Sequence, residues 1–193
     1  DLGLKPLMLG GEHSITSGAV KAIVKFNPDL ILVQLDAHAD LRHEWLGSQH
    51  SHACAMRRCL EVLPSKQIFQ LAIRSGTSEE FQEIKEQKWL IPHKHGQPAI
   101  DLEQALTPYL GKPIYVTVDL DWFDPCVMPG TGTPEPGGFL WTDFAAVVAV
   151  LTKHQIAGAD IVELSPQLDP SGISSILAAK VARSLLMLLS NSK

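Results

Sequence analysis

Two short segments of this chain place carboxylate and imidazole side chains directly after apolar runs. The segment Asp36–Asp40 reads Asp-Ala-His-Ala-Asp and follows the apolar run 30–35, and the segment Asp119–Asp121 reads Asp-Leu-Asp and follows the run 114–118. An apolar run that stops at charged residues is typical of a buried parallel strand whose carboxyl end opens onto a site. The charged residues of both segments are therefore expected at one edge of a sheet.

Alternation along an extended chain would bring these side chains together. Residues i, i+2 and i+4 of a strand face the same side, so Asp36, His38 and Asp40 can converge. The same rule applies to Asp119 and Asp121. Burying these carboxylates without cations would cost a large desolvation free energy. A pair of divalent metal ions would neutralise them, and the pattern therefore predicts a binuclear metal site.

The composition is that of a globular chain. Hydrophobic residues make up 45% and charged residues 19% of the 193 residues, with a formal net charge of -5. A chain of this length can bury a real core, and with no repeat, linker or low-complexity tract we expect a single domain over residues 1–193. The negative charge disfavours nucleic acid as a partner and favours a cationic small molecule.

Cysteine usage and hydropathy indicate a cytoplasmic protein. The three cysteines, Cys54, Cys59 and Cys126, have neither CxxC spacing nor an even-numbered framework, so we expect reduced thiols. No signal peptide or membrane span is predicted, because the longest apolar stretch, Val181–Leu189, is interrupted by Arg183 and is about half the length that a spanning helix needs. The chain opens at Asp1 almost directly in an apolar run, and we expect a preceding amino-terminal part with further strands.

Short apolar strands and helical stretches alternate along the chain. Strands are expected at 4–9, 30–35, 68–73, 89–91, 114–118 and 159–164, and helices at 15–26, 53–63, 79–88, 101–110, 142–154 and 174–189. This alternation predicts an α/β fold with a central parallel sheet covered by helices on both faces, which makes three αβα layers.

Five segments in series carry a resemblance to a known family. They are the turn Gly10–Ser14 (GGEHS), the two acidic segments Asp36–Asp40 and Asp119–Asp121, the loop Pro129–Gly138 (PGTGTPEPGG) and the strand end Val162–Pro166 (VELSP). Together they resemble the ureohydrolase family of arginases and agmatinases. The resemblance covers nearly the whole chain and implies the arginase-like three-layer fold, here without its amino-terminal strands. It also implies a homo-oligomer, a trimer or a hexamer.

The resemblance assigns the metal ligands by motif. They would be His13, Asp36, His38, Asp40, Asp119 and Asp121, which in the family hold two Mn²⁺ ions. A carboxylate-rich set with two imidazoles and no thiolate suits Mn²⁺ better than structural Zn²⁺. Ni²⁺, Co²⁺ or Fe²⁺ could occupy the same ligands.

The chemistry of a guanidinium group explains why two metals are wanted. Its carbon is a poor electrophile because resonance spreads the positive charge over three nitrogens, and water at neutral pH is a poor nucleophile. A hydroxide bridging two cations is available because metals lower the pKa of water from 15.7 toward about 7. The tetrahedral intermediate must then expel an amine, and the resemblance gives the proton relay in that step to Asp40.

Two further residues take catalytic and substrate-binding roles from the resemblance. Glu163 in the VELSP segment matches the family's guanidinium-binding glutamate, which can accept two parallel N–H bonds. His52 in Ser51-His52-Ala53 matches the non-ligand histidine that shuttles a proton or contacts the substrate. His50 lies two residues away and is the alternative to His52. The remaining histidines, His93, His95 and His154, fall outside the site segments.

The remaining interpretations concern the substrate and the loops. The loop 41–51 has no clear polar cradle for an α-amino carboxylate, so hydrolysis of agmatine to putrescine and urea, a step of polyamine biosynthesis, is the preferred reaction. Guanidinobutyrate, guanidine or arginine is the alternative substrate, and Arg42 would either pair with a substrate carboxylate or form a structural salt bridge. Cys126 is expected to serve packing, and Gly137 and Gly138 to permit close backbone approach.

Two readings of another class remain open. A non-catalytic relative serving as a binding subunit would be expected to have lost ligands, whereas all of them are present. A metal-dependent deacetylase of related architecture would keep fewer carboxylates and one Zn²⁺.

Overall fold

The central sheet is parallel throughout and lies between two layers of helices. The computed structural model describes residues 4–64, 67–91 and 97–191. The strands are β1 (Leu7–Leu9), β2 (Ile31–Leu35), β3 (Ile68–Leu71), β4 (Leu90–Ile91), β5 (Pro113–Asp119) and β6 (Gln155–Val162). They stand in the order β1-β6-β5-β2-β3-β4. The predicted α/β fold with a parallel sheet is therefore confirmed.

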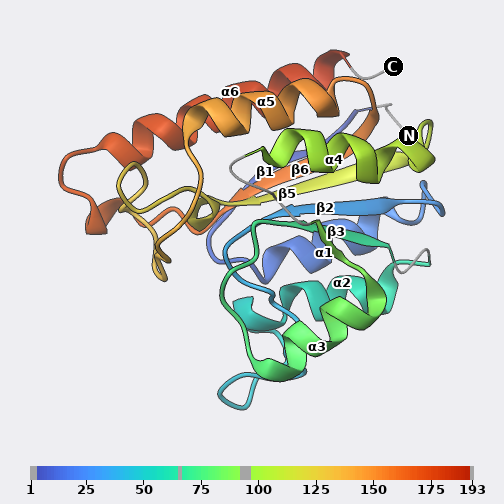
Figure 1. Cartoon of the computed structure of the whole chain (residues 1–193), viewed down its shortest axis with the longest axis horizontal. Helices are drawn as coiled ribbons and strands as arrows, with labels where there is room; N and C mark the ends of the chain where they lie inside the picture. The colour runs from blue at the N-terminus through green and yellow to red at the C-terminus, as the bar shows by residue number, and fades with distance from the viewer. Residues whose placement is uncertain (1–3, 65–66, 92–96, 192–193) are drawn as a thin grey trace.

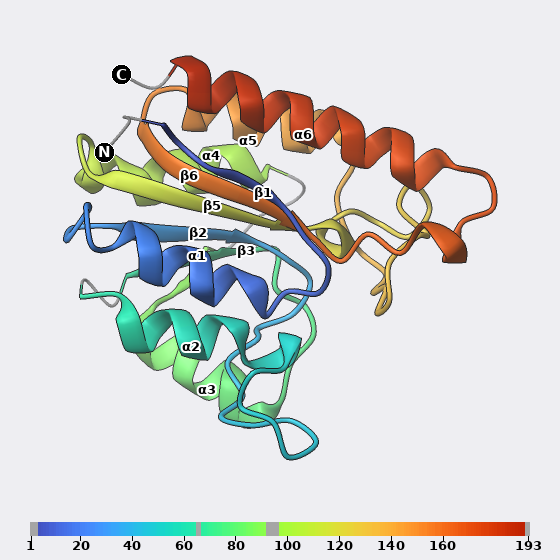
Figure 2. The same ribbon diagram turned by 180° about the vertical axis from the view of Figure 1, so that it is seen from behind.

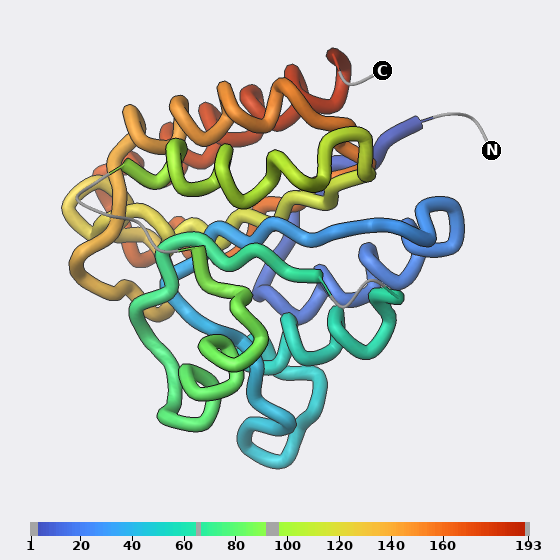
Figure 3. Tube along the Cα trace, turned by 45° about the vertical axis from the view of Figure 1, so that its right-hand side comes forward, coloured from blue at the N-terminus to red at the C-terminus, as the bar shows by residue number. Residues whose placement is uncertain are grey.

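The helices divide evenly between the two faces of the sheet. They are α1 (Ile15–Ile23), α2 (Ala55–Val62), α3 (Ser78–Gln87), α4 (Pro98–Leu106), α5 (Trp141–Leu151) and α6 (Ile173–Asn191). Figures 1 and 2 show α4, α5 and α6 on one face and α1, α2 and α3 on the other, and the tube in Figure 3 shows the same layering from another side. Short 3-10 turns follow or precede several of these elements at 52–54, 107–109, 120–122 and 166–168.

The strands are apolar on both faces because both faces are covered. Along β2, Ile31, Val33 and Leu35 pack into the core under α4–α6, whereas Leu32 packs into the core over α1–α3. Successive side chains of a strand point to opposite faces, so a strand between two helical layers reads as a continuous apolar run. Every residue of β2 is buried.

The boundary between α5 and β6 differs from the prediction. The helix predicted over 142–154 ends at Leu151, and the strand predicted over 159–164 begins at Gln155 and ends at Val162. β6 pairs with β5 over its whole length, from Pro113 opposite Gln155 to Asp119 opposite Val162. Backbone pairing with β5 thus extends the strand through Gln155 and Gly158, whose residue types do not predict a strand.

Helix α6 is long and apolar enough to cross a membrane by length and composition. It packs instead as a core helix, because Ala178, Val181, Leu185 and Leu188 at helical spacing are buried in the core that it shares with the sheet. Length and composition alone are weak evidence for a span.

The loop 129–138 ends where its backbone meets the segment after the 3-10 turn 120–122. A Cβ atom on Gly138 would lie 2.5 Å from the backbone nitrogen of Asp124 and from the backbone carbon of Phe123. Gly137 has a φ of 84°, a conformation that favours glycine. The predicted close approach is therefore confirmed at Gly138, whereas a Cβ atom on Gly137 would meet nothing within 4 Å. The contact positions the loop beside the acidic strand ends.

Gly138→Ala should therefore lower the free energy of unfolding by about 1–3 kcal/mol, the usual cost of forcing an extra group into a packed site. Gly132→Ala in the same loop is the matched control, because a Cβ atom there meets nothing within 4 Å. Thermal unfolding of both variants measures the difference. Equal melting temperatures for the two variants would contradict the close approach at Gly138.

Candidate metal centre

The predicted ligands lie at the carboxyl ends of neighbouring strands. His13 lies in the turn after β1, Asp36 directly follows β2 and Asp119 ends β5. β6 stands between β1 and β5 in the sheet, and Glu163 directly follows it. Ligand sites of open parallel sheets form outside the carboxyl ends of the strands. The sheet order thus gathers residues from both halves of the sequence at one edge.

The side chains converge in two groups that share Asp36. The first group contains His13, Asp36 and Asp119, and the second contains Asp36, His38 and Asp121. Within each group one ligand atom of every residue lies within 4.8 Å of the others. Asp36 reaches both groups because its Oδ2 lies 3.1 Å from Nδ1 of His13 and its Oδ1 lies 3.7 Å from Nδ1 of His38. A shared carboxylate is what a pair of adjacent cations requires.

The first group also includes Asp40. Its Oδ2 lies 3.0 Å from Nδ1 of His13, beside Asp36 Oδ2 at 3.1 Å and Asp119 Oδ2 at 3.3 Å. His13 is fully buried, and its Nδ1 has no hydrogen-bond partner despite these short distances. A buried imidazole nitrogen that faces three carboxylate oxygens requires a shared cation, which is either a metal ion between them or, without metal, a proton on the nitrogen. The donor set therefore suits a metal ion.

The second group is held by the imidazole of His38. Its Nδ1 lies 2.9 Å from Oδ2 of Asp121, and its Nε2 lies 3.9 Å from Oε1 of Glu135 in the loop 129–138. Ser75 donates a hydrogen bond of 3.0 Å to the same Glu135 oxygen. Metal-binding histidines commonly turn their second nitrogen toward a carboxylate, which orients the ring. Glu135 is placed to do this for His38.

Buried amides orient the central carboxylate. Gln34 donates from Nε2 to Asp36 Oδ2 at 2.7 Å and to the carbonyl of His38 at 3.1 Å. Gln70, which lies opposite Gln34 in the sheet, donates to Oε1 of Gln34 at 2.7 Å. The backbone nitrogen of His38 donates to Asp36 Oδ1 at 2.6 Å. Both oxygens of Asp36 are thus fixed before any ligand binds.

Arg74 connects the loop 129–138 to the acidic strand end. Its Nη2 donates to the carbonyl oxygen of Asp121 at 2.7 Å and to that of Glu135 at 2.8 Å, and its Nε donates to the carbonyl of Pro136 at 3.1 Å. One guanidinium therefore holds the backbone on both sides of the second group. The Arg74 guanidinium does not neutralise the ligand carboxylates directly, because it donates to backbone carbonyl oxygens instead.

Protons take the place of cations when no metal is bound. Burial lowers the pKa of His38, but the carboxylates of Asp121 and Asp36 outweigh it and raise the pKa to about 11. The surrounding carboxylates likewise outweigh burial at His13 and raise its pKa well above the usual value. Burial and the negative charge of Asp36 raise the pKa of Asp40 to about 7. A metal that binds must therefore displace protons.

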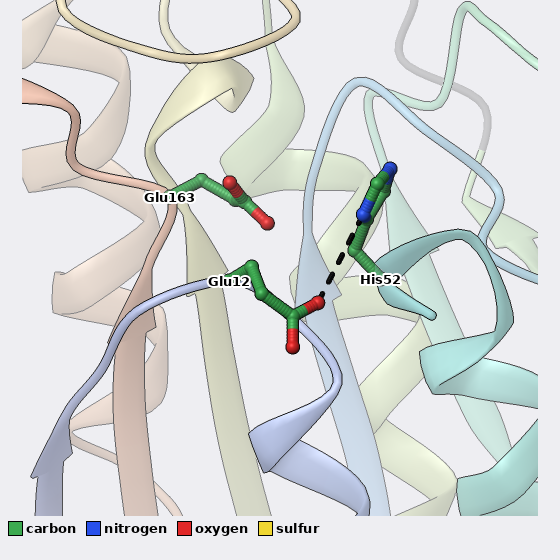
Figure 4. A group of neighbouring side chains, drawn as sticks. All are labelled: Glu12, His52 and Glu163. Carbon is green, nitrogen blue, oxygen red and sulfur yellow. Dashed lines mark ion pairs between the residues drawn. The ribbon is translucent and has the colours of Figure 1, made fainter. Parts of the chain in front are cut away.

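Glu163, His52 and Glu12 form a second cluster beside the first group. Figure 4 shows the three side chains pointing toward a common space from the end of β6, from the turn before α2 and from the turn after β1. One ligand atom of each lies within 4.8 Å of the others, and His52 Nδ1 lies 3.9 Å from Glu12 Oε2. Glu163 adopts a φ of 67°, and its Oε1 accepts a 2.8 Å hydrogen bond from the backbone nitrogen of His13.

A cavity of about 290 Å³ joins the two clusters. His13, His38 and Asp119 line its floor, and His52 and Glu163 line its wall. Arg42, Trp45 and Glu80 also line it. The guanidinium carbon of Arg42 lies 4.0 Å from the ring centroid of Trp45, and its Nε lies 3.8 Å from a Glu80 oxygen. Arg42 therefore forms the structural salt bridge, one of the two roles that the sequence left open.

The family-model comparison agrees with this geometry. The model of the Arginase family matches residues 1–188. This chain belongs to the arginase family. The agmatinase of Halalkalibacterium halodurans is 37% identical to it over 184 residues, which cover 94% of this chain and 63% of that protein. The N(1)-aminopropylagmatine ureohydrolase of Synechocystis sp. is 38% identical over 92% of this chain and 58% of that protein.

Solved structures of the arginase family have the same fold. A crystal structure of a candidate agmatinase from Clostridium difficile superposes with a TM-score of 0.89 and 40% identity, over 97% of this chain and 68% of that one. This arginase-family chain spans less than two thirds of the length of the two curated relatives.

The structure also places the other residues that the sequence singled out. His52 lines the cavity, whereas the alternative, His50, is exposed and is not among the residues that line it. The packing role expected for Cys126 is wrong, because this side chain is exposed. His154 is buried away from the cluster, and Cys54 and Cys59 are buried free thiols. His93 and His95 lie outside the described residues.

The sequence interpretation missed the residues that support the ligands from behind. They are Gln34, Gln70, Thr117, Glu135 and Asp160. Four of them share one signal, a polar residue inside an otherwise apolar buried strand. Such a residue must find a hydrogen-bond partner within the core, so it marks a position next to other polar groups.

The raised pKa values predict how metal-free stability depends on pH. An imidazole whose pKa rises from 6.5 to about 11 stabilises the fold fully below about pH 6.5, and this stabilisation is lost as the pH rises toward 11. Asp40, with its pKa near 7, adds a decline in the same direction between its usual value and pH 7. The melting temperature of metal-free protein should therefore fall from pH 6 to pH 8.

Saturating Mn²⁺ should raise the melting temperature more at pH 8 than at pH 6, because fewer protons must then be displaced. His38→Asn is the control and should flatten part of the decline. A metal-induced shift that is equal at both pH values would contradict the displacement of protons.

Proposed function

We propose that this chain carries the catalytic centre of a ureohydrolase that splits a guanidino compound, agmatine above all, into an amine and urea. The observation that carries the proposal is the convergence of two carboxylate–imidazole groups, sharing Asp36, on the floor of a cavity whose wall presents Glu163 and His52. The similarity to an agmatinase at 37% identity supports the choice of reaction.

Two divalent cations would be held by the two groups. His13, Asp36, Asp40 and Asp119 would hold one, and Asp36, His38 and Asp121 would hold the other. Oxygen-rich ligands with two imidazoles favour Mn²⁺, and Ni²⁺, Co²⁺ or Fe²⁺ suit the same donors. When bound, such a pair supplies hydroxide near neutral pH by lowering the pKa of water.

Glu163 would bind the guanidinium. Its Oε1 already accepts the backbone N–H of His13 at 2.8 Å, so the carboxylate is fixed in direction, and Figure 4 shows it pointing toward the space that it shares with Glu12 and His52. The left-handed backbone at this residue is costly for a glutamate, and such strain persists where the surrounding structure holds a functional side chain. A carboxylate held in this way orients a planar cation by charge-assisted hydrogen bonds.

His52 and Asp40 would handle the protons. His52 is about half exposed, with a relative side-chain exposure of 46%, so it can exchange protons with solvent while its ring faces the Glu163 wall. Asp40, which also lines the cavity, would relay a proton to the departing amine.

The cavity favours a substrate without a carboxylate. The guanidinium of Arg42 lies against Trp45 and Glu80, so this cation is engaged inside the protein. A substrate carboxylate would have to compete for this cation with Glu80, whose oxygens are held in place by the backbone nitrogens of Leu41 and Thr77. Agmatine meets no such competition, whereas arginine and guanidinobutyrate do.

Variants separate metal binding from substrate binding. Asp121→Asn should abolish urea release and reduce the manganese content from two ions per chain, because a ligand charge is removed. Glu163→Gln should keep both ions and lower kcat/KM by about 10- to 100-fold, the loss expected for one charge-assisted hydrogen bond. Glu86→Gln on the exposed side of α3 is the control. Elemental analysis and urea release are measured on each variant, and full activity of Glu163→Gln would remove this residue from the site.

The expected substrate preference follows from the contacts of the Arg42 guanidinium with Glu80 and Trp45. We expect kcat/KM for agmatine to exceed the values for arginine and guanidinobutyrate by about 10-fold or more, which corresponds to ~1.4 kcal/mol, because their carboxylates would compete with Glu80 for the Arg42 guanidinium. Guanidine, which has no carboxylate, is tested beside them. Urea release from the four compounds by the manganese-loaded protein decides it. A preference for one of the other three would replace agmatine as substrate and leave the ureohydrolase reaction intact.

A further inference from the structure

A buried carboxylate on β6 has no part in the reaction described above. Asp160 is fully buried, and it lies opposite Thr117 in the pairing of β6 with β5. Thr117 donates its hydroxyl hydrogen to Asp160 Oδ1 at 2.6 Å, and Tyr115 donates to Oδ2 at 2.8 Å. A buried ionised carboxylate is costly unless such donors surround it, so the arrangement calls for a reason.

The hydroxyl of Thr117 also contacts the first metal group. Its Oγ1 lies 2.9 Å from Nε2 of His13, and both atoms are buried. A threonine hydroxyl has one hydrogen, and a carboxylate can only accept. Once Thr117 gives its hydrogen to Asp160, its oxygen can only accept from His13, so Nε2 must carry the ring hydrogen. The Nδ1 lone pair is then directed at Asp36, Asp40 and Asp119.

We propose that Asp160, acting through Thr117, is a positioning residue that fixes the His13 ring with its hydrogen on Nε2 and its Nδ1 lone pair facing the first metal. The inference rests on the proposed metal site and extends it to a chain of contacts, His13–Thr117–Asp160, that connects the turn after β1 with β5 and β6. The negative charge at its far end strengthens the ring as a donor to a cation. Thr16, whose hydroxyl lies 3.4 Å from that of Thr117, closes the polar pocket from α1.

The contrast with His38 sharpens the inference. His38 turns its Nε2 toward Glu135 in a loop, at 3.9 Å, and its side chain is 24% exposed. His13 is fully buried. Its Nε2 contacts the hydroxyl of Thr117 on β5, and this hydroxyl in turn donates to Asp160 on β6. The outer nitrogens of the two rings therefore have different surroundings, and a change at Thr117 or Asp160 leaves those of His38 untouched.

The first test is a matched pair of variants at one position. Thr117→Val keeps the shape of the side chain and removes the hydroxyl, whereas Thr117→Ser keeps the hydroxyl. Calorimetric titration of metal-free protein with Mn²⁺ should show two tight sites in the parent chain and in Thr117→Ser. In Thr117→Val one site should weaken by about 10- to 100-fold, as expected for loss of a supporting contact, while the site of Asp36, His38 and Asp121 keeps its affinity.

A second pair tests the carboxylate. Asp160→Asn allows the amide to donate to Thr117, which turns the hydroxyl hydrogen toward His13 and opposes the metal-binding form of the ring. It should weaken the same single site. Tyr115→Phe removes only the donor to the other oxygen of the same carboxylate, so it should weaken this site much less than Asp160→Asn does and leave the other site unchanged. Should Thr117→Val fail to fold, the comparison of Asp160→Asn with Tyr115→Phe decides the inference.

The outcomes separate this inference from the proposed reaction. Parent affinity at both sites in folded Thr117→Val and Asp160→Asn, or equal weakening of both sites, would overturn the positioning role. Urea release by the parent chain is measured in parallel. Two tight manganese sites in the parent without urea from any guanidino compound would overturn the proposed reaction and leave the role of Asp160 standing.

Discussion

Mutual repulsion of buried carboxylates is the constraint on which the rest of this structure depends. Asp36, Asp40, Asp119 and Asp121 are almost completely inaccessible to solvent, and like charges at such distances cannot all remain ionised without cations between them. The raised pKa values of both imidazoles are the metal-free answer to this constraint, because protonated rings supply the missing positive charge. A metal pair is the alternative answer, and it uses the same atoms.

The parallel sheet makes this concentration of charge possible. Parallel strands end at the same edge, and the order β1-β6-β5-β2 places four such ends side by side. Two of the residues that follow these strands, Asp40 and Glu163, adopt left-handed backbone conformations with φ of 55° and 67°. Packing of the elements on either side offsets this backbone strain. The strained backbone lowers the stability of the fold and directs two carboxylates toward the site.

Behind the ligands, polar side chains replace apolar ones in the core. Gln34, Gln70, Thr117 and Asp160 each interrupt a buried strand, and each is hydrogen-bonded to a ligand or to another of these side chains. A partly satisfied network would destabilise the core, whereas a connected one fixes a single arrangement of the ligands.

The sequence by itself determined the types of the six candidate ligands, the strand after which each lies and the α/β class, because an apolar run that ends in acids depends on local pattern alone. It could not show that Asp160 reaches His13 through Thr117, or that Arg42 is engaged by Glu80 and Trp45. Apart from Arg42 and Trp45, which are three positions apart, those contacts join residues that are far apart along the chain, up to 104 positions for His13 and Thr117. Only the order of the strands in the sheet decides which side chains meet, and that order is set by packing of the whole core.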